Sequence, residues 1–199
     1  MKSTLTSAAL AATALIVGCS SPKTTYVEPG SSRLVTNVDQ INIQDFAQAA
    51  DTMVNSLIDN LINPGQLKSG VPDQPALLAI SRIQNNTGTQ LDTDLLVKKM
   101  RVALLRTGKV QTSTTIAYGG AEDPLMAEEE KNNQFFNDKP KRRPDYTLSG
   151  KIIEDRTRAG NVRQSAFVFQ LSLSSRDGIG VWEDEKTIVK QGSRPSVGF

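Results

Sequence analysis

Histidine is absent from this chain of 199 residues, and cysteine occurs once, as Cys19. Without histidine, Ser-His-Asp and Cys-His nucleophile systems cannot form, and zinc sites built from His and Cys are excluded with them. Hydrolysis by two carboxylates needs neither residue type. The acidic residues, however, include a run typical of a solvated face: Glu122, Asp123, Glu128, Glu129 and Glu130. The sequence therefore predicts a protein that is not an enzyme, with no catalytic residue, metal site or cofactor.

A large excess of charge of one sign is also missing, because 23 basic residues are balanced by 21 acidic ones. Proteins that bind nucleic acid, or that sense membranes through polybasic segments, need such an excess, so no nucleic-acid partner is expected. No apolar run long enough to span a bilayer follows residue 18. About 160 residues remain beyond the N-terminal region, which fits one domain with a single core.

The N-terminus has the pattern of a bacterial lipoprotein. Lys2 precedes an uncharged run over residues 8–17, which is typical of a secretory signal and too short for a mature membrane helix. Ile16-Val17-Gly18-Cys19 resembles a lipobox, whose cysteine thiol receives a diacylglycerol. We therefore expect residues 1–18 to be a signal peptide and Cys19 to be the lipid attachment site. Ser20, where an aspartate would favour the inner membrane, indicates the periplasmic face of the outer membrane. An ordinary secreted protein is the alternative.

Residues 19–41 follow as a lipidated cysteine and a flexible tether, rich in Ser, Thr, Pro and Gly and without helical periodicity. Fully extended, its roughly twenty residues reach about 70 Å, and as a random coil about 25 Å. The domain is therefore expected to lie near the membrane.

Two amphipathic helices are predicted. In residues 42–63 apolar positions recur at helical spacing, with Asn42 as N-cap, Asp45 three residues on, and Pro64-Gly65 at the end. Residues 92–107 form the second helix, and Gly108 stands where a left-handed residue usually ends one. In this second helix we expect Leu95, Leu96, Met100, Ala103 and Leu104 to face inward, and Lys98, Lys99 and Arg101 to face outward.

Strands are expected over residues 75–83 and 109–113, parallel to each other because a helix connects them. Residues 84–88 between the first strand and the helix read as a loop with a tight turn. Residues 146–155, 165–174 and 181–190 alternate apolar and polar side chains, and Asp177-Gly178 joins the last two in an antiparallel hairpin. The expected fold is a single α/β (α+β) domain over residues 42–192, with a mixed sheet of about four to five strands packed with helices. Residues 193–199 are expected to form a loose tail.

Residues 117–145 have the weakest pattern. Pro124 could open a helix, and the following loop contains Lys139-Pro140-Lys141-Arg142-Arg143-Pro144. Its basic cluster is either a docking site for a partner or an anionic polymer, or a solvated loop, which is the more frequent case.

Several short motifs occur in a defined order. A strand leads into Asn85-Asn86-Thr87, followed by Leu91-Asp92 and a helix, and Leu105 leads through Gly108-Lys109-Val110 out of that helix. Asp145-Tyr146-x-Leu148-x-Gly150-x-Ile152 marks a third strand, and Val181-Trp182-Glu183 before Ile188-x-Lys190 marks the last. In order and spacing these motifs resemble the family of penicillin-binding-protein activator lipoproteins related to LpoB, over residues 75–115 and 143–192.

This resemblance implies an outer-membrane regulator that stimulates a class A penicillin-binding protein by binding it, and we expect the protein to be a monomer. The partner surface is expected among seven residues: Asn85, Asn86, Thr87, Lys139, Lys141, Arg142 and Arg143. Members of the best-known branch carry an acidic residue and an arginine around the turn, where this chain has Ser81 and Asn86, so those contacts are not transferred. Two alternatives are a structural or assembly lipoprotein of a secretion or cell-surface complex, and a carboxylate enzyme that acts on cell-wall glycan.

Overall fold

The computed structural model describes residues 26–28, 31, 36–116, 120–121 and 142–193. The chain divides into two units, Met1–Leu34 and Val35–Phe199, and every described helix and strand belongs to the second. Within these described ranges, no helix is long and apolar enough to cross a membrane. Several predictions concern residues outside the described ranges. These residues are Cys19, Lys139, Lys141, the helix expected from Pro124, and residues 194–199 of the expected tail.

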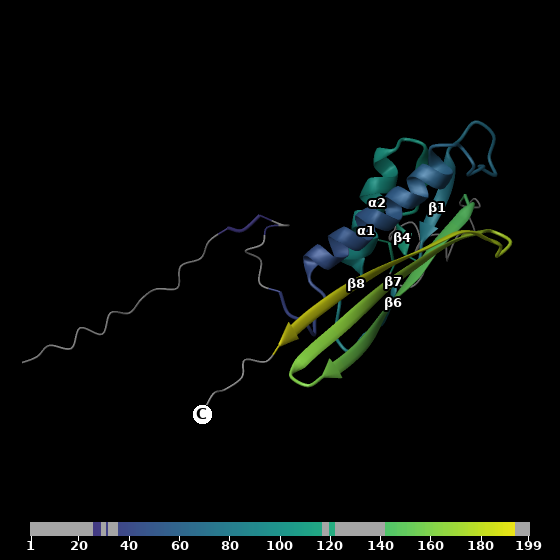
Figure 1. Ribbon diagram of the computed structural model, residues 1–199. Coiled ribbons are helices and arrows are strands. Elements are labelled where there is room, and N and C mark those ends of the chain that lie inside the picture. The colour runs from purple at the N-terminus through teal and green to yellow at the C-terminus, as the bar shows by residue number, and fades with distance from the viewer. Residues whose placement is uncertain (1–25, 29–30, 32–35, 117–119, 122–141, 194–199) are drawn as a thin grey trace, which may run out of the picture. The chain divides into compact units, whose positions relative to one another are not determined.

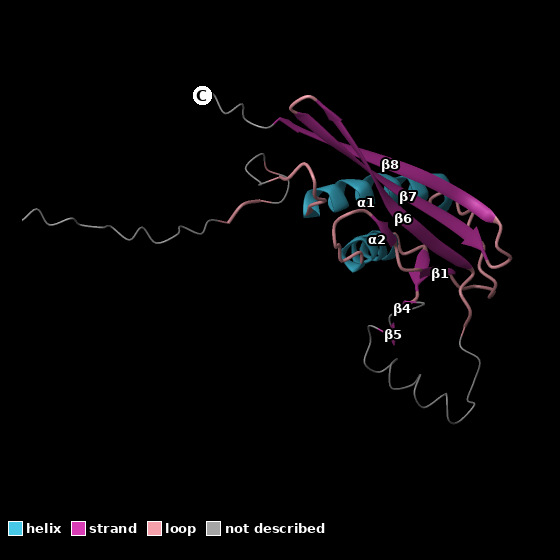
Figure 2. Cartoon of the chain, turned by 90° about the horizontal axis from the view of Figure 1, so that it is seen from below, coloured by secondary structure: helices cyan, strands magenta, loops and turns pink. Residues whose placement is uncertain are grey.

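The second unit has two layers, with both α-helices on the same face of one sheet (Figures 1 and 2). The helices are α1 (Ile43–Leu57), a π-helix η1 (Ile58–Ile62) that continues it, and α2 (Asp94–Arg106). The strands of the main sheet are β1 (Ala76–Ile80), β2 (Gln84–Asn86), β3 (Val110–Thr112), β6 (Tyr146–Ala159), β7 (Val162–Ser175) and β8 (Gly180–Ser193). A separate pair is formed by β4 (Thr115–Ile116) and β5 (Gly120–Ala121).

The strand order is β3-β1-β6-β7-β8, with β2 paired to β6. β1 is parallel to both β3 and β6, whereas β6, β7 and β8 are antiparallel to one another. The predicted mixed α/β sheet with antiparallel C-terminal strands is therefore confirmed. The sheet has six strands, more than expected, because β2 joins it. The loop expected at residues 84–88 consequently begins as a strand and turns only after Asn86.

The start of α1 is fixed by the predicted capping box. The Asn42 side chain accepts hydrogen bonds from the backbone N–H groups of Gln44 (3.0 Å) and Asp45 (3.1 Å). The Asp45 carboxylate accepts the N–H of Asn42 at 2.7 Å, so both residues satisfy N–H groups that the helix leaves open. The helix buries one side against the sheet, where Phe46 meets Phe169 edge to face at 6.1 Å between ring centroids.

The inward side of α2 differs from the prediction at two positions. Leu95, expected to face the core, is 49% exposed, and Arg101, expected to face solvent, is 4% exposed. The reason is the rotation of the helix, because its buried apolar residues are Leu96, Val97, Met100 and Leu104. This set centres the core-facing side roughly half a turn away from Leu95. Gly108 follows with φ of 67°, as predicted for a left-handed residue after the last turn.

The alternating pattern of β7 was predicted correctly. Its odd-numbered apolar side chains are all buried beneath the helices: Phe167, Phe169, Leu171 and Leu173. The β6–β7 hairpin nevertheless extends beyond the predicted strands, because the two strands stay in register as far as Ala159 and Val162. Gly160, with φ of 60°, makes the turn between them.

Residues 36–41 lie against the sheet. Ile41 belongs to the core, and Asp39 forms an ion pair of 3.1 Å with Arg163 of β7. The Lys190 ammonium donates to the carbonyl oxygen of Gln40 at 2.7 Å. The packed part of the chain therefore includes residues assigned above to the tether.

Candidate partner-binding surface

The Asn85 side chain, in β2, holds the compact turn that follows the strand at Thr87. The side-chain oxygen Oδ1 of Asn85 accepts from the backbone N–H and the hydroxyl of Thr87, at 3.1 and 2.7 Å. The side-chain Nδ2 of Asn85 donates to the backbone carbonyl of Thr89 at 2.8 Å. Asn86 between them is exposed. Of the three predicted contact residues, Asn85 and Thr87 therefore use their polar groups in hydrogen bonds within the turn. Asn86 is the one whose side chain is exposed to solvent.

A carboxylate of β6 holds this turn against the sheet. The Glu154 carboxylate accepts the N–H of Gly88 at 2.8 Å and the Nε–H of Arg156 at 2.5 Å. The Glu154 side chain is only 4% exposed, whereas that of Arg156 is 53% exposed. The hydrogen bond and the charge of Glu154 raise the pKa of Arg156 above its usual value. The turn is therefore fixed in place beside an exposed, permanently cationic group.

A shallow groove of about 720 Å³ lies on the face of the sheet that the helices do not cover. A second groove, of about 510 Å³, adjoins the turn. The second is lined by the connection between β1 and β2 and by the residues that lead into α2: Ser81, Arg82, Ile83, Gln84, Asn85, Leu91 and Thr93. Two of these residues, Ile83 and Leu91, are apolar, and the others are polar. Such a recess beside a rigid turn can receive a side chain of a partner protein.

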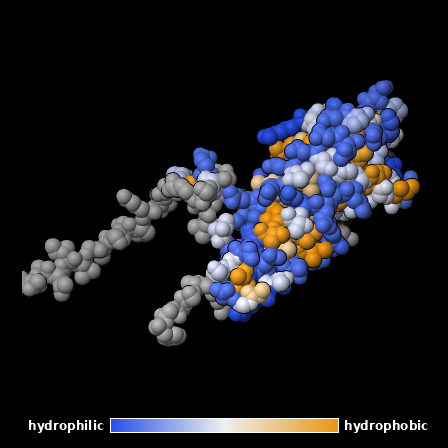
Figure 3. Space-filling view, in the orientation of Figure 1, coloured by the Kyte–Doolittle hydropathy of each residue, from blue (hydrophilic) through white to orange (hydrophobic). Residues whose placement is uncertain are grey.

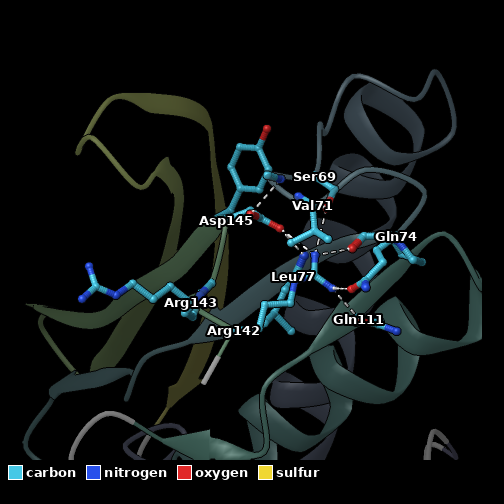
Figure 4. A network of polar contacts seen from close by, with 12 residues as sticks. Ser69, Val71, Gln74, Leu77, Gln111, Arg142, Arg143 and Asp145 are labelled. Carbon is cyan, nitrogen blue, oxygen red and sulfur yellow. Dashed lines mark hydrogen bonds and ion pairs between the residues drawn. The ribbon is translucent and has the colours of Figure 1, made fainter. Parts of the chain in front are cut away.

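Arg142, by contrast, is committed to contacts within the domain (Figure 4). Its two terminal nitrogens donate to five acceptors, at 2.7–3.1 Å: Gln74 Oε1, Gln111 Oε1, Ser69 Oγ, the Pro75 carbonyl and Asp145 Oδ2. These acceptors come from the loop after α1, from β3 and from the segment before β6. Its geometry therefore supports a role in joining these segments, and a contact between its terminal nitrogens and a partner would compete with these bonds.

Asp145 is the buried centre of that network. Besides Arg142, its carboxylate accepts the N–H groups of Gly70 (3.0 Å) and Leu77 (2.9 Å) and lies 3.5 Å from the Arg176 guanidinium. Burial opposes ionisation, but the bonds from Leu77, Gly70 and Arg142 outweigh it and hold the pKa of Asp145 below its usual value. The carboxylate is therefore an ionised anchor of the fold.

Arg143 is exposed, and Figure 4 shows its side chain directed away from the network. The structure does not bring it together with the turn. Arg143 precedes β6, whereas the turn lies beside Glu154, eight residues after Tyr146, or about 27 Å along the strand. The two predicted sets of contact residues therefore belong to separate regions, and the grouping of Lys139 and Lys141 with either is not tested.

The sequence analysis missed Glu154 and Arg156. Both occupy even-numbered positions of β6, so they project from the same face, and that alternation is visible in the sequence. What the sequence lacks is any sign that β2 pairs with β6, which brings Gly88 to Glu154. In the described ranges, no three His, Cys, Asp or Glu side chains lie close enough together to hold a metal ion.

Figure 3 shows one face of the molecule, on which blue, hydrophilic side chains predominate, with orange patches over the long strands and at the end of the β7–β8 hairpin. Ile179, in that hairpin turn, is 64% exposed.

Comparison with solved structures finds proteins of low sequence identity. The LpoB C-terminal domain from Escherichia coli is 15% identical, with 72% of this chain and 98% of that one covered and a TM-score of 0.43. The same domain from Salmonella enterica is 16% identical, with the same coverages and a TM-score of 0.42. The PelC dodecamer from Paraburkholderia phytofirmans is 22% identical, with 61% and 75% covered and a TM-score of 0.29. No curated protein matches the chain.

The family comparison is more extensive. Residues 45–188, from the first turns of α1 into β8, match the model of the peptidoglycan-synthase activator LpoB. That range covers most of the chain and includes the turn, the groove and the Asp145 network. The chain therefore belongs to the LpoB family of peptidoglycan-synthase activators.

Proposed function

We propose that this protein is an outer-membrane lipoprotein that binds a class A penicillin-binding protein and stimulates its synthesis of peptidoglycan. The observation that carries the proposal is the family match over residues 45–188, which spans almost the whole packed domain. An activator of this kind acts through a surface, without a catalytic group of its own. The absence of histidine from the sequence is consistent with that mode of action.

The lipid is proposed to be attached at Cys19, after removal of residues 1–18. Residues 20–35 then form the tether, with a reach of about 55 Å when extended and about 22 Å as a random coil. The domain would act as a monomer at the periplasmic face of the outer membrane. Replacing Cys19 by Ser should abolish acylation and move the protein from the membrane fraction to the soluble periplasmic fraction. Retention in the membrane would contradict the lipid anchor.

The proposed contact surface includes the turn at Asn85–Thr87 and the adjoining groove. Its support is pre-organisation, because hydrogen bonds within the turn and the anchor to Glu154 fix the backbone before a partner arrives. Asn86, the last residue of β2, supplies an exposed side chain next to the turn. Arg142 is left out of this surface, because its donors are used inside the domain.

The test is peptidoglycan synthesis by each class A penicillin-binding protein of the organism, with and without residues 19–199 carrying Cys19→Ser. Binding is measured in parallel. A raised rate of glycan polymerisation or crosslinking together with direct binding is the expected result. If no synthase binds, the proposal fails, and assembly into a large oligomer would then favour the alternative role in a surface complex.

The contact residues need a separate comparison. Asn86→Glu places a charge at the end of β2, next to the turn, and should weaken binding about tenfold, as expected at a central contact. Thr187→Glu, at an exposed position of β8 on the other side of the sheet, is the matched control and should bind like the wild type. Equal affinities of the two variants would remove the turn from the interface.

A further inference from the structure

Three large apolar side chains stand exposed on α2. Leu95 is 49% exposed, Val102 39% and Leu105 46%. Leu95 and Val102 are two helical turns apart and lie on the same line along the helix, with Leu105 at its border. The other large apolar residues that are exposed in the described domain are Ile43 in α1, Ile179 and Val181 at the β7–β8 hairpin, and Val189 in β8. Aligned exposed apolar groups are typical of an interaction surface.

The same side of α2 is cationic. Lys99 and Arg106 are exposed and project within about 40° of the direction of Leu95, at 100° of rotation per residue. The only acidic residue of the helix is Asp94, in its first turn. We define the α2 ridge as Leu95, Lys99, Val102 and Arg106, with Leu105 at its edge. A partner surface complementary to this ridge would combine carboxylates with an apolar recess.

The ridge begins two residues after the proposed contact surface along the chain. Leu91 and Thr93 line the groove beside the turn, and Leu95 follows in the first turn of α2. From Leu95 the ridge extends about 15 Å along the helix, to Leu105.

We propose that the α2 ridge docks onto an acidic, partly apolar surface of the peptidoglycan synthase. This inference rests on the proposed function and names the chemistry of its partner surface. The apolar residues supply the buried contact, and Lys99 and Arg106 pair with carboxylates at its border.

Two other occupants fit the ridge less well. A bilayer is bound by helices with larger apolar residues and aromatic groups, whereas this ridge carries three aliphatic side chains, no aromatic one, and Asp94 at its end. A second copy related by a twofold axis would bring the ridge onto itself. Lys99 and Arg106 would then face cations of the other copy, which opposes association.

The test uses the full mature chain with Cys19→Ser and the purified synthase. Leu95→Ser combined with Val102→Ser should weaken binding at least tenfold, and Ile43→Ser, at a 55% exposed position of α1, is the matched control. Lys99→Glu should weaken binding several-fold and reduce its dependence on salt. Lys151→Glu makes the same charge change at an exposed position of β6 and should have little effect. Circular dichroism and the melting temperature verify that each variant folds.

The outcomes separate the two proposals. If the wild type binds no synthase, both the function and the docking surface are overturned. If the wild type binds and the ridge variants bind as tightly as their controls, only the docking surface is overturned. Vesicles of phosphatidylethanolamine and phosphatidylglycerol form a further arm. Loss of vesicle binding by the ridge variants, with synthase binding unchanged, would assign the ridge to the membrane and overturn the inference.

Discussion

The two α-helices lie side by side on the same face of the sheet, yet they differ in their charge and in the apolar side chains that they expose to solvent. The segment Ile43–Ile62 of α1 and η1 contains three aspartates and no basic residue, and its only large apolar side chain in the exposed class is Ile43, at 55%. α2 contains four basic residues and one aspartate, and exposes three large apolar side chains. Both helices bury a core-facing side, so packing alone does not explain the difference.

The contrast suggests a division of roles. α1 packs against both β8 and α2, and its capping box fixes where it begins. α2 packs on α1 and β3, and its outer side carries the ridge. Burial of apolar area is the main source of stability, and exposed apolar groups add little to it. We therefore expect substitutions on the outer side of α2 to change binding, and substitutions on the buried side of α1 to change stability.

The largest effect is expected for the core side of α1. Leu57 is 1% exposed at the junction of α1 and η1, and Leu57→Ala removes buried methyl groups and leaves a cavity. The free energy of unfolding should fall by about 3 kcal/mol. Urea denaturation measures it, with Ile43→Ala on the exposed side as the control. A loss below about 1 kcal/mol would show that this junction repacks and that the buried side of α1 contributes less to stability than proposed.

The next largest effect is expected for the Asp145 network, which joins the loop after η1 to β3 and to the start of β6. Because the pKa of Asp145 is lowered in the folded state, its ionised form stabilises the fold above the unfolded value of about 4. That contribution is lost as the pH falls through the folded pKa. Asp145→Asn should therefore cost about 2 kcal/mol at neutral pH, and the gap to the wild type should narrow between about pH 5 and pH 2.

Unfolding curves across that range test the Asp145 prediction. Asp51→Asn, on the exposed side of α1, changes a carboxylate in the same way and should have little effect at neutral pH. A gap for Asp145→Asn that is constant with pH would mean that hydrogen-bond geometry, and not charge, carries the contribution.

The different outer sides of α1 and α2 also show how far the sequence predicts the fold. Periodicity predicted the strand with Phe167 and Phe169 and most of both helices, because burial on one side imposes that period. Local chemistry predicted the Asn42 cap and the left-handed Gly108. The prediction was wrong for Leu95 and Arg101, because the rotation of α2 depends on its packing partners. Apolar residues on both sides of a helix leave that rotation undetermined.

The sequence analysis missed strand β2 and the outer end of the β6–β7 hairpin, both of which are stabilised by backbone pairing. β2 consists of three polar residues, and the end of the β6–β7 hairpin is rich in charged and polar residues, so neither has an apolar alternation to detect. Their hydrogen-bonded partners are distant in the sequence or follow from the register of a longer ladder. The link from Gly88 to Glu154 depends on that pairing, and for this reason the surroundings of the turn could not be predicted.

A smaller effect is expected at the start of α1. Asn42→Ala removes the side chain that accepts the N–H groups of Gln44 and Asp45, and should lower stability by about 1 kcal/mol. The start of α2 is a natural comparison, because its N-cap Thr93 makes no side-chain capping bond. Asn42→Asp, which keeps an acceptor, should restore most of the loss in thermal unfolding. If it does not, the amide of Asn42 has a role beyond the cap.

The smallest change in stability is expected on the outer side of α2. Leu104 and Leu105 are neighbours, but Leu104 is fully buried whereas Leu105 is 46% exposed. Leu104→Ala should cost about 3 kcal/mol, and Leu105→Ala less than about 0.5 kcal/mol. If Leu105→Ala also weakens binding to the synthase, its side chain serves the partner and not the core. A stability loss at Leu105 comparable to that at Leu104 would instead place both sides of α2 in the folded core and remove the contrast between the helices.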